Sequence, residues 1–161
     1  MAQALMRTRY SPGPGLGHSR SRISIVLLPL LFYGESITQG GCASRAGNSH
    51  VSLLGRALDV EVVNLGFSGS GKAESSLAEA ISRLRLAGMV CDLGHAPNAP
   101  NFLRIIREAQ PDLPILILSK TYSDEKLSRL LFDASDQKHT WFLDGKSIFT
   151  DNDVCWEKVV G

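Results

Sequence analysis

Short apolar runs alternate along this chain with segments in which apolar residues recur every three or four positions. The runs are typical of strands in a parallel sheet, which is covered on both faces and is therefore apolar almost throughout. The segments with the longer spacing are typical of helices that bury one face. The pattern predicts five strands, at residues 23–33, 60–67, 88–94, 113–119 and 139–145. It predicts helices between them, at residues 50–58, 74–86, 101–110 and 123–135.

Three residues refine the predicted boundaries. Pro29 lies inside the first apolar run and cannot donate to a sheet ladder, so we expect a bulge there or a strand that starts late. Ser123 or Asp124 is a suitable N-cap for the last predicted helix.

Strands that alternate with helices of about 10–15 residues form right-handed crossovers. The predicted fold is therefore a three-layer α/β/α sandwich with a central parallel sheet of about five strands.

The beginning of the chain differs from the rest in composition. Residues 1–22 carry four arginines and no acid and are rich in Pro, Gly and Ser, which predicts a disordered basic arm before a domain at residues 23–161. A basic region followed by an apolar run also resembles a secretory signal. No small-residue cleavage site precedes Gly34, however, and the run is shorter than the roughly 20 apolar residues that span a bilayer. We therefore expect no signal peptide and no membrane span, which favours the cytoplasm and leaves the compartment unknown.

Composition and charge exclude several classes of partner. Apolar residues make up 43% of the chain and charged residues 20%, as in a globular domain, and the net charge of +1 creates no field that would attract nucleic acid. Cys42, Cys91 and Cys155 form no CxxC pair and have no metal-ligand spacing. We expect no cofactor, no metal and no nucleic-acid partner.

The chemistry is expected in the loops that follow the strands, because parallel sheets bind ligands beyond the carboxyl ends of their strands. Ser36 comes directly after the first strand, where Gly34 eases the bend and the hydroxyl can act as a nucleophile. The glycines of residues 66–72 can bring backbone N–H groups close to an oxyanion, and Asn98 can add a side-chain donor. A structural interpretation stays open. Ser36 and Ser68 are also good helix caps, as are Asn98 and Asn101.

Four stretches of the sequence resemble the SGNH/GDSL hydrolases, and the likeness over residues 32–72 is to a bacterial branch of that family. GESITQGG (34–41) is similar to the first motif block and NLGFSGSGK (64–72) to the second. HAPNAP (95–100) is a weaker match to the third block, and WFLDGKSIF (141–149) also resembles the same branch. The resemblance implies a flavodoxin-like fold and a serine esterase or acylhydrolase without a cofactor. Its substrate would be a small-molecule or carbohydrate ester with a short acyl group.

Carried over by position, the resemblance implies three site residues. Ser36 would attack the ester carbonyl, and its own N–H, the N–H of Gly69 and the side chain of Asn98 would hold the oxyanion. Asn101 is the spare candidate for the last role. Glu35 stands where an aspartate or a small residue is commoner in the family.

The general base is where the sequence departs from the family, which supplies it from a C-terminal Asp-x-x-His that is usually followed by proline. Asp136 and His139 form the one literal Asp-x-x-His. They precede the last predicted strand, so we expect His139 near the amino edge of the sheet and remote from Ser36. We therefore expect the acid–base half of the site to be absent.

The other candidate groups for proton transfer are few. Of His18, His50 and His95, His95 alone is expected in a loop that can reach the site, and a loop histidine of this kind is more often a surface or capping residue. Asp92 is expected to be structural at the end of a strand.

Three expectations follow from this departure. The chain is expected to hydrolyse esters slowly or not at all. A missing last helix is expected to leave an apolar sheet face uncovered, which favours self-association and lowers stability. A non-catalytic module of the same fold that binds carbohydrate or an ester is the alternative function.

A phosphate or nucleotide binder is disfavoured, because Ala73 stands where a phosphate-binding loop has Ser or Thr after its lysine.

Overall fold

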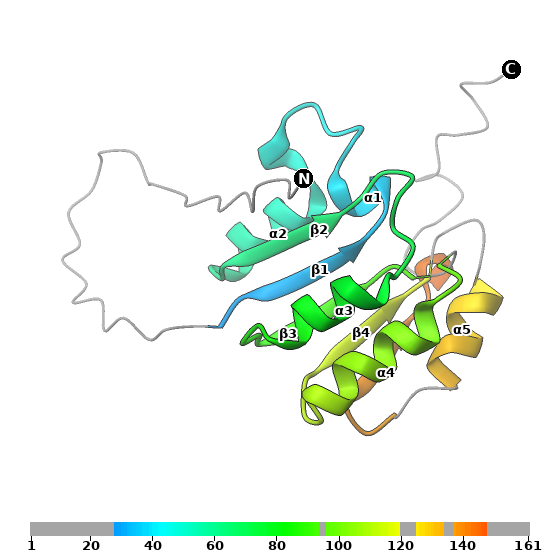
Figure 1. The fold of residues 1–161 in the computed structure, drawn as a ribbon. Helices are drawn as coiled ribbons and strands as arrows, with labels where there is room; N and C mark the ends of the chain where they lie inside the picture. Colours follow the sequence, from blue (N-terminus) through cyan, green and yellow to red (C-terminus); the bar gives the residue numbers. More distant parts are fainter. Residues whose placement is uncertain (1–27, 94–95, 120–124, 134–136, 148–161) are drawn as a thin grey trace, which may run out of the picture.

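The computed structural model describes residues 28–93, 96–119, 125–133 and 137–147 (Figure 1). The predicted basic arm, the signal-like start of the first apolar run and the candidate caps Ser123 and Asp124 lie outside these ranges. So do His18, His95 and Asp136.

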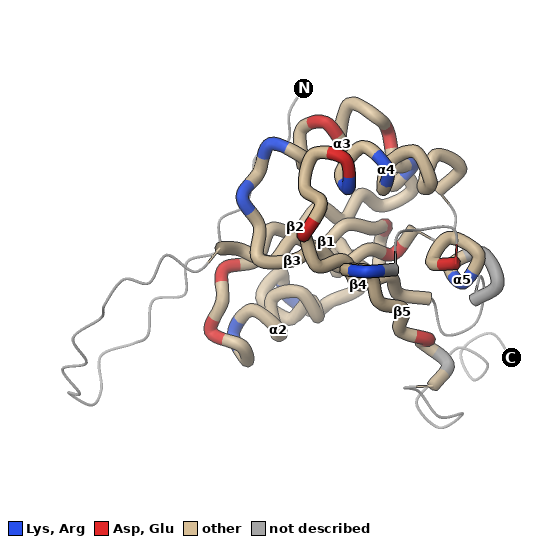
Figure 2. Tube along the Cα trace, turned by 90° about the horizontal axis from the view of Figure 1, so that it is seen from below, with Lys and Arg blue, Asp and Glu red and all other residues tan. Residues whose placement is uncertain are grey.

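Five parallel strands form one sheet in the order β2-β1-β3-β4-β5. The strands are β1 (Leu30–Gly34), β2 (Val62–Gly66), β3 (Gly88–Cys91), β4 (Ile115–Leu118) and β5 (Thr140–Leu143). The helices are α1 (Ser36–Gln39), α2 (His50–Leu58), α3 (Ser75–Ser82), α4 (Ala99–Ala109) and α5 (Glu125–Asp133). Single 3-10 turns lie at Ala46–Asn48, Gln137–His139 and Gly145–Ser147. Figure 2 shows α3 and α4 on one side of the sheet and α2 on the other. The predicted three-layer α/β/α sandwich with a five-stranded parallel sheet is confirmed.

Two boundaries show how single residues end or start an element. β1 starts directly after Pro29, which accounts for the late start predicted from that proline. The predicted helix at 74–86 is wrong at its end, because α3 stops at Ser82. Gln110, just after α4, donates through Nε2 to the Ser82 and Leu84 carbonyls and so satisfies the open end of α3. Leu86 is thereby left to enter the core instead of continuing the helix.

The core lies between the sheet and the layer formed by α3, α4 and α5. Alternate strand residues face this side and are buried: Leu31, Tyr33, Met89, Cys91, Ile115 and Ile117. Apolar helix residues pack on them, among them Ile81, Phe102, Ile106 and Leu131. Burial of apolar surface on this scale is the main stabilising term of a small domain.

The opposite face of the sheet is covered unevenly. Phe32, Val90, Leu116 and Trp141 are register partners, so they form one row across four strands. Phe32 is 3% exposed and its ring meets His50 of α2 edge-on at 6.3 Å, whereas Trp141 at the other end of the row is 52% exposed. Leu143, also on β5, is 37% exposed. In the ranges that the structure describes, the β4–β5 end of this face is therefore open to solvent.

Candidate active site

The fold brings the first and third loops to the same edge of the sheet, because β1 and β3 are adjacent parallel strands. β1 lies between β2 and β3 in the sheet, so the chain leaves β1 toward one side and returns to its other side. Ligands bind at such a switch point, beyond the carboxyl ends of the strands. Ser36 stands there, two residues after the end of β1, as the first residue of α1, and its side chain is exposed.

Backbone geometry excludes the capping role for two serines. Glu35, not Ser36, occupies the N-cap position of α1, and its side chain makes no capping bond. Ser68 lies in the turn after β2, whereas Glu74 is at the N-cap position of α3. Capping therefore does not explain why serine occurs at either position.

The second loop lies directly against the first. A Cβ on Gly66 would lie 2.0 Å from the backbone nitrogen of Gln39, so only glycine allows α1 to approach the end of β2 this closely. The Phe67 N–H donates to the Gly34 carbonyl at 2.9 Å, and the Ser68 N–H donates to Gln39 Oε1 at 3.1 Å. These bonds hold the loop after β2 beside the loop that carries Ser36.

A buried tyrosine holds the far end of the second loop. The Tyr33 hydroxyl accepts a hydrogen bond from the Ala73 N–H at 2.8 Å. Burial raises the pKa of Tyr33 to about 12, with smaller contributions from Glu74 and other nearby groups, so the phenol is protonated at neutral pH. Ala73 has φ +55, a left-handed conformation that costs a non-glycine residue energy and that this bond helps to hold.

Gly69 lies at the exposed tip of this loop. The Ser70 N–H donates to the Phe67 carbonyl at 3.0 Å, which closes a turn over residues 67–70. Gly69 has φ +66, and no atom lies within 4 Å of where its Cβ would be. Within the described ranges no hydrogen bond uses the Gly69 N–H. The geometry leaves this donor open to a ligand.

The two asparagines of the third loop have different roles. Asn98 occupies the N-cap position of α4, but its side chain makes no capping bond and is exposed. The Asn101 amide donates to Ser75 Oγ at 3.0 Å and its oxygen accepts from Arg104 at 2.8 Å, which ties α4 to α3. Asn98 therefore caps α4 by its position but not through its side chain, whereas the Asn101 side chain makes contacts to α3 and within α4.

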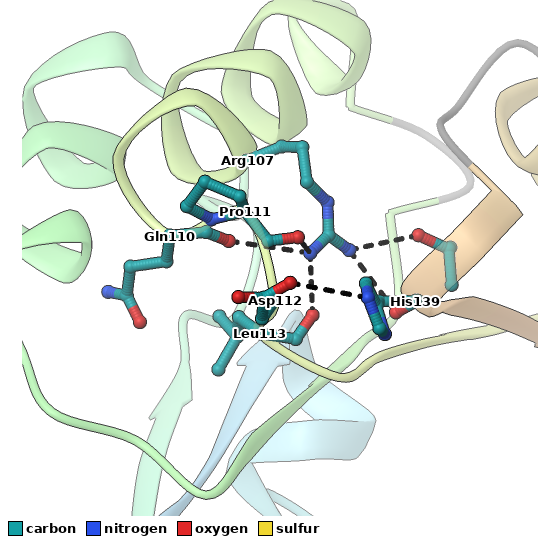
Figure 3. A network of polar contacts seen from close by, with 7 residues as sticks. Arg107, Gln110, Pro111, Asp112, Leu113 and His139 are labelled. Atoms are coloured by element: carbon teal, nitrogen blue, oxygen red, sulfur yellow. Dashed lines mark hydrogen bonds and ion pairs between the residues drawn. The ribbon is translucent and has the colours of Figure 1, made fainter.

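His139 lies at the opposite end of the sheet from Ser36, as the sequence predicts. It directly precedes β5, whereas Ser36 follows β1, and the two strands run parallel in one sheet. Figure 3 shows the surroundings of His139: its Nε2 lies 3.4 Å from Asp112 Oδ1, and its carbonyl accepts from Arg107 at 3.2 Å. Neither contact connects His139 to the site.

Arg107 organises this amino edge. Its guanidinium donates to the carbonyls of Gln110, Pro111, Leu113 and His139 and to Thr140 Oγ1 at 2.7–3.4 Å (Figure 3). The side chain of one helical residue thus fastens the turn before β4 to the start of β5.

His50 and Asp92 are the other titratable candidates within the described ranges. The ring of His50 packs against Phe32, and burial lowers the pKa of His50. Asp92 directly follows β3, and its N–H donates to the Tyr33 carbonyl at 2.9 Å. Its Cβ lies 3.0 Å from where a Cβ on Gly34 would be, so Asp92 borders the first loop. The structural role at the strand end stays a prediction for Asp92.

Within the described ranges, no group of three or more His, Cys, Asp or Glu side chains could hold a metal ion. None of the helices in that part of the chain is long and apolar enough to cross a membrane.

Sequence reasoning missed the side chains that join the loops, namely Tyr33, Gln39 and Asn64. Each lies one or two residues from a motif glycine, and each uses a hydrogen bond to the backbone of a residue 26 to 40 positions away. Such partners have no local signature. The nearby glycines Gly34, Gly40 and Gly66 are the one signal in the sequence.

Ser36 is thus an exposed serine at the switch point of a parallel sheet, and hydrogen bonds hold the loop of Gly69 beside the loop that carries it. The model of the GDSL-like lipase/acylhydrolase family matches residues 28–148, and the chain belongs to this family. No curated protein matches the chain.

Several solved structures share the fold. A GDSL-like lipase from Bacteroides ovatus is 23% identical, with a TM-score of 0.61, over 78% of this chain and 45% of that one. The salicylyl-acyltransferase SsfX3 from a tetracycline biosynthetic pathway is 20% identical, with a TM-score of 0.65, over 76% and 44%. The Clostridium thermocellum family 3 carbohydrate esterase is 14% identical, with a TM-score of 0.55, over 81% and 85%. This chain thus spans less than half the length of the first two structures.

Proposed function

We propose that this chain carries the nucleophile and oxyanion half of a serine esterase or acylhydrolase. The observation that supports it most is the exposed Ser36 at the switch point, beside a loop whose Gly69 amide is open to a ligand. Membership in the GDSL-like family adds support, because the family is one of acylhydrolases.

In the proposed reaction, Ser36 Oγ forms a bond to the carbonyl carbon of the ester, and the carbonyl π electrons move to oxygen. The Ser36 N–H, the Gly69 N–H and the Asn98 side chain stabilise that oxyanion. Loss of one such donor typically lowers the rate by about 10²–10³. Ser36 loses its proton to solvent water as it attacks, and the alkoxide expelled when the intermediate collapses takes a proton from solvent and leaves as the alcohol. Water then hydrolyses the acyl-enzyme to the acid and free Ser36.

The serine proton needs an acceptor, and the proposal assigns this role to no described histidine. His139 lies at the amino edge of the sheet, and His50 packs on Phe32 of the α2 face. We therefore expect slow hydrolysis by the 161-residue chain, since a serine hydroxyl is a weak nucleophile until a base takes its proton.

The substrate is proposed to be a small-molecule or carbohydrate ester with a short acyl group. A similar structure is a family 3 carbohydrate esterase, and another is a salicylyl-acyltransferase. Both names describe the chemistry of acyl groups. They support the substrate class for this chain without identifying the alcohol.

A non-catalytic module that binds carbohydrate or an ester is the second candidate. The observation that favours it is the same absence of a histidine beside Ser36 among the described residues. Binding of an ester without any covalent product would support this alternative.

The open end of the sheet supports one further part of the proposal, which is association with a second copy of the chain. The row from Phe32 to Trp141 becomes more exposed toward β5, and a two-fold contact would bury the Trp141 ends of two copies against each other. Contiguous exposed apolar patches mark contact surfaces, and Trp141 and Leu143 lie two residues apart on the same face of β5.

Covalent labelling tests the main proposal. Ser36 is expected to react slowly but selectively with a fluorophosphonate, as seen by intact-protein mass and peptide mapping, and Ser36→Ala is expected to abolish the reaction. Ser70→Ala is the matched control, because Ser70 is an exposed serine of the neighbouring loop. Equal labelling of the wild type and Ser36→Ala would contradict the proposal. Fast ester hydrolysis that His139→Ala abolishes would overturn the exclusion of His139.

A further inference from the structure

Gln39 links the loop of Ser36 to the loop of Gly69. It is the last residue of α1, three positions after Ser36. Its Oε1 accepts a hydrogen bond from the N–H of Ser68, the residue directly before Gly69, at 3.1 Å. A side chain of the nucleophile-bearing helix therefore fixes the backbone next to the candidate oxyanion donor.

Asn64 fixes the separation between α1, which carries Gln39, and the end of β2. Its Nδ2 donates to the Thr38 carbonyl at 2.9 Å, and its Oδ1 accepts from the Gly66 N–H at 2.9 Å. The end of β2 thus meets the backbone of α1 directly, in agreement with the lack of room for a side chain on Gly66. With α1 and β2 held together in this way, the Gln39 side chain reaches one particular amide.

The turn over residues 67–70 decides where the Gly69 N–H points. Gly69 is the third residue of this turn, and its φ of +66 is the signature of a type II turn. A type I turn differs by about 150° in ψ of the second residue and about 170° in φ of the third. These changes reverse the peptide between Ser68 and Gly69. The Gly69 N–H therefore points in opposite directions in the two forms.

We propose that Gln39 is a positioning residue, which holds the Ser68 N–H and so keeps this turn in the form that presents the Gly69 N–H to the oxyanion. Gln39 itself does not touch the substrate. The inference rests on the proposed function, because the orientation of the Gly69 N–H matters for catalysis only if Ser36 is the nucleophile.

Two substitutions of Gln39 separate the hydrogen bond from the side chain's bulk. Gln39→Met has a similar length and no acceptor oxygen in the right place, whereas Gln39→Glu keeps an oxygen that can accept the Ser68 N–H. The first-order rate of Ser36 labelling by the fluorophosphonate is expected to fall about 10-fold or more in Gln39→Met, short of the 10²–10³ for a lost donor. Gln39→Glu is expected to stay close to the wild type.

Turnover of an activated ester gives a second kinetic readout. A donor that acts on the oxyanion acts in the transition state, so Gln39→Met is expected to lower kcat and leave KM nearly unchanged. A purely structural role would lower the melting temperature of Gln39→Met and Gln39→Glu without this split. Equal loss of rate in the two variants would overturn the inference.

Amide NMR tests the same point without any chemistry. In the 15N-labelled chain, the Ser68 and Gly69 cross-peaks are expected to shift or broaden in Gln39→Met and to keep their wild-type positions in Gln39→Glu. Unchanged Gly69 cross-peaks in Gln39→Met would refute the positioning role. If Ser36→Ala labels like the wild type, the proposed function fails, and the NMR result still decides whether Gln39 controls the turn.

Discussion

Alanine is expected to have opposite effects at Gly66, the last residue of β2, and at Gly69 in the loop that follows. Gly66→Ala should mainly lower the stability of the fold, and Gly69→Ala should mainly lower the labelling rate of Ser36. At Gly66 the new methyl group would lie 2.0 Å from the Gln39 nitrogen and 2.6 Å from the Thr38 carbonyl carbon. These are backbone atoms, so α1 has to move away from β2. Such overpacking costs about 1–3 kcal/mol. The Asn64 and Gln39 bonds across this contact add about 1 kcal/mol each if they are lost.

The sum of about 3–5 kcal/mol is a large part of the roughly 5–15 kcal/mol that keeps a domain folded. At Gly69 a methyl group meets no atom within 4 Å, so the cost is that of left-handed backbone, about 1–2 kcal/mol. The same alanine disfavours the type II turn, so the labelling rate of Ser36 is expected to fall toward the 10²–10³ of a lost oxyanion donor.

Thermal or urea unfolding measures the stability of both variants. Fluorophosphonate labelling under folding conditions measures the reactivity of Ser36. Gly66→Ala should lose about 10 °C or more in melting temperature, and Gly69→Ala a few degrees. A Gly66→Ala protein as stable as the wild type would refute the close approach of α1 to β2. A Gly69→Ala protein that labels at the wild-type rate would refute the role of this amide.

Three other predictions follow from single contacts. Asn98→Ala is expected to lower the Ser36 labelling rate about 10²-fold with little change in stability to urea. Asn101→Ala should lose about 1 kcal/mol of stability and keep the labelling rate. The reverse pattern would exchange the roles of the two residues. Trp141→Lys is expected to make the chain monomeric, as measured by analytical ultracentrifugation. Leu130→Lys, at an equally exposed leucine of α5, should leave the association unchanged. A wild-type chain that is monomeric at every concentration would contradict association. Burial lowers the pKa of His50 below 6.5, so the unfolded chain binds more protons, and the free energy of unfolding should fall as pH drops below 6.5. His50→Phe should flatten that part of the urea-unfolding profile, and an unchanged slope would show that His50 is not the group.

Much of the fold could be predicted because the strands are locally recognisable. β4 is a short apolar run that ends before Ser119. β1 begins at Leu30, the first residue after Pro29, which has no N–H to donate to the sheet. The end of α3 could not be predicted, because it depends on Gln110, which lies 28 positions beyond Ser82. A carbonyl that is capped from another helix has no signal in its own segment.

The candidate site was predictable to the extent that it depends on loop glycines and motif serines. The positions of Ser36 and Gly69 follow from the strand ends that precede them. The supporting contacts of Gln39 and Asn64 were not predictable, since they depend on the packing of β2 beside β1 and not on neighbours in sequence.

The Arg107 clamp depends little on the side chains of the residues that it holds. Among the described residues, four of its five acceptors are main-chain carbonyls, which every amino acid supplies. Replacement of the side chains at positions 110, 111, 113 or 139 therefore leaves those four bonds intact. The clamp itself therefore tolerates new side chains at its acceptor residues, although Gln110 is still needed to cap α3, while the opposite end of the sheet has no room for any side chain at Gly66.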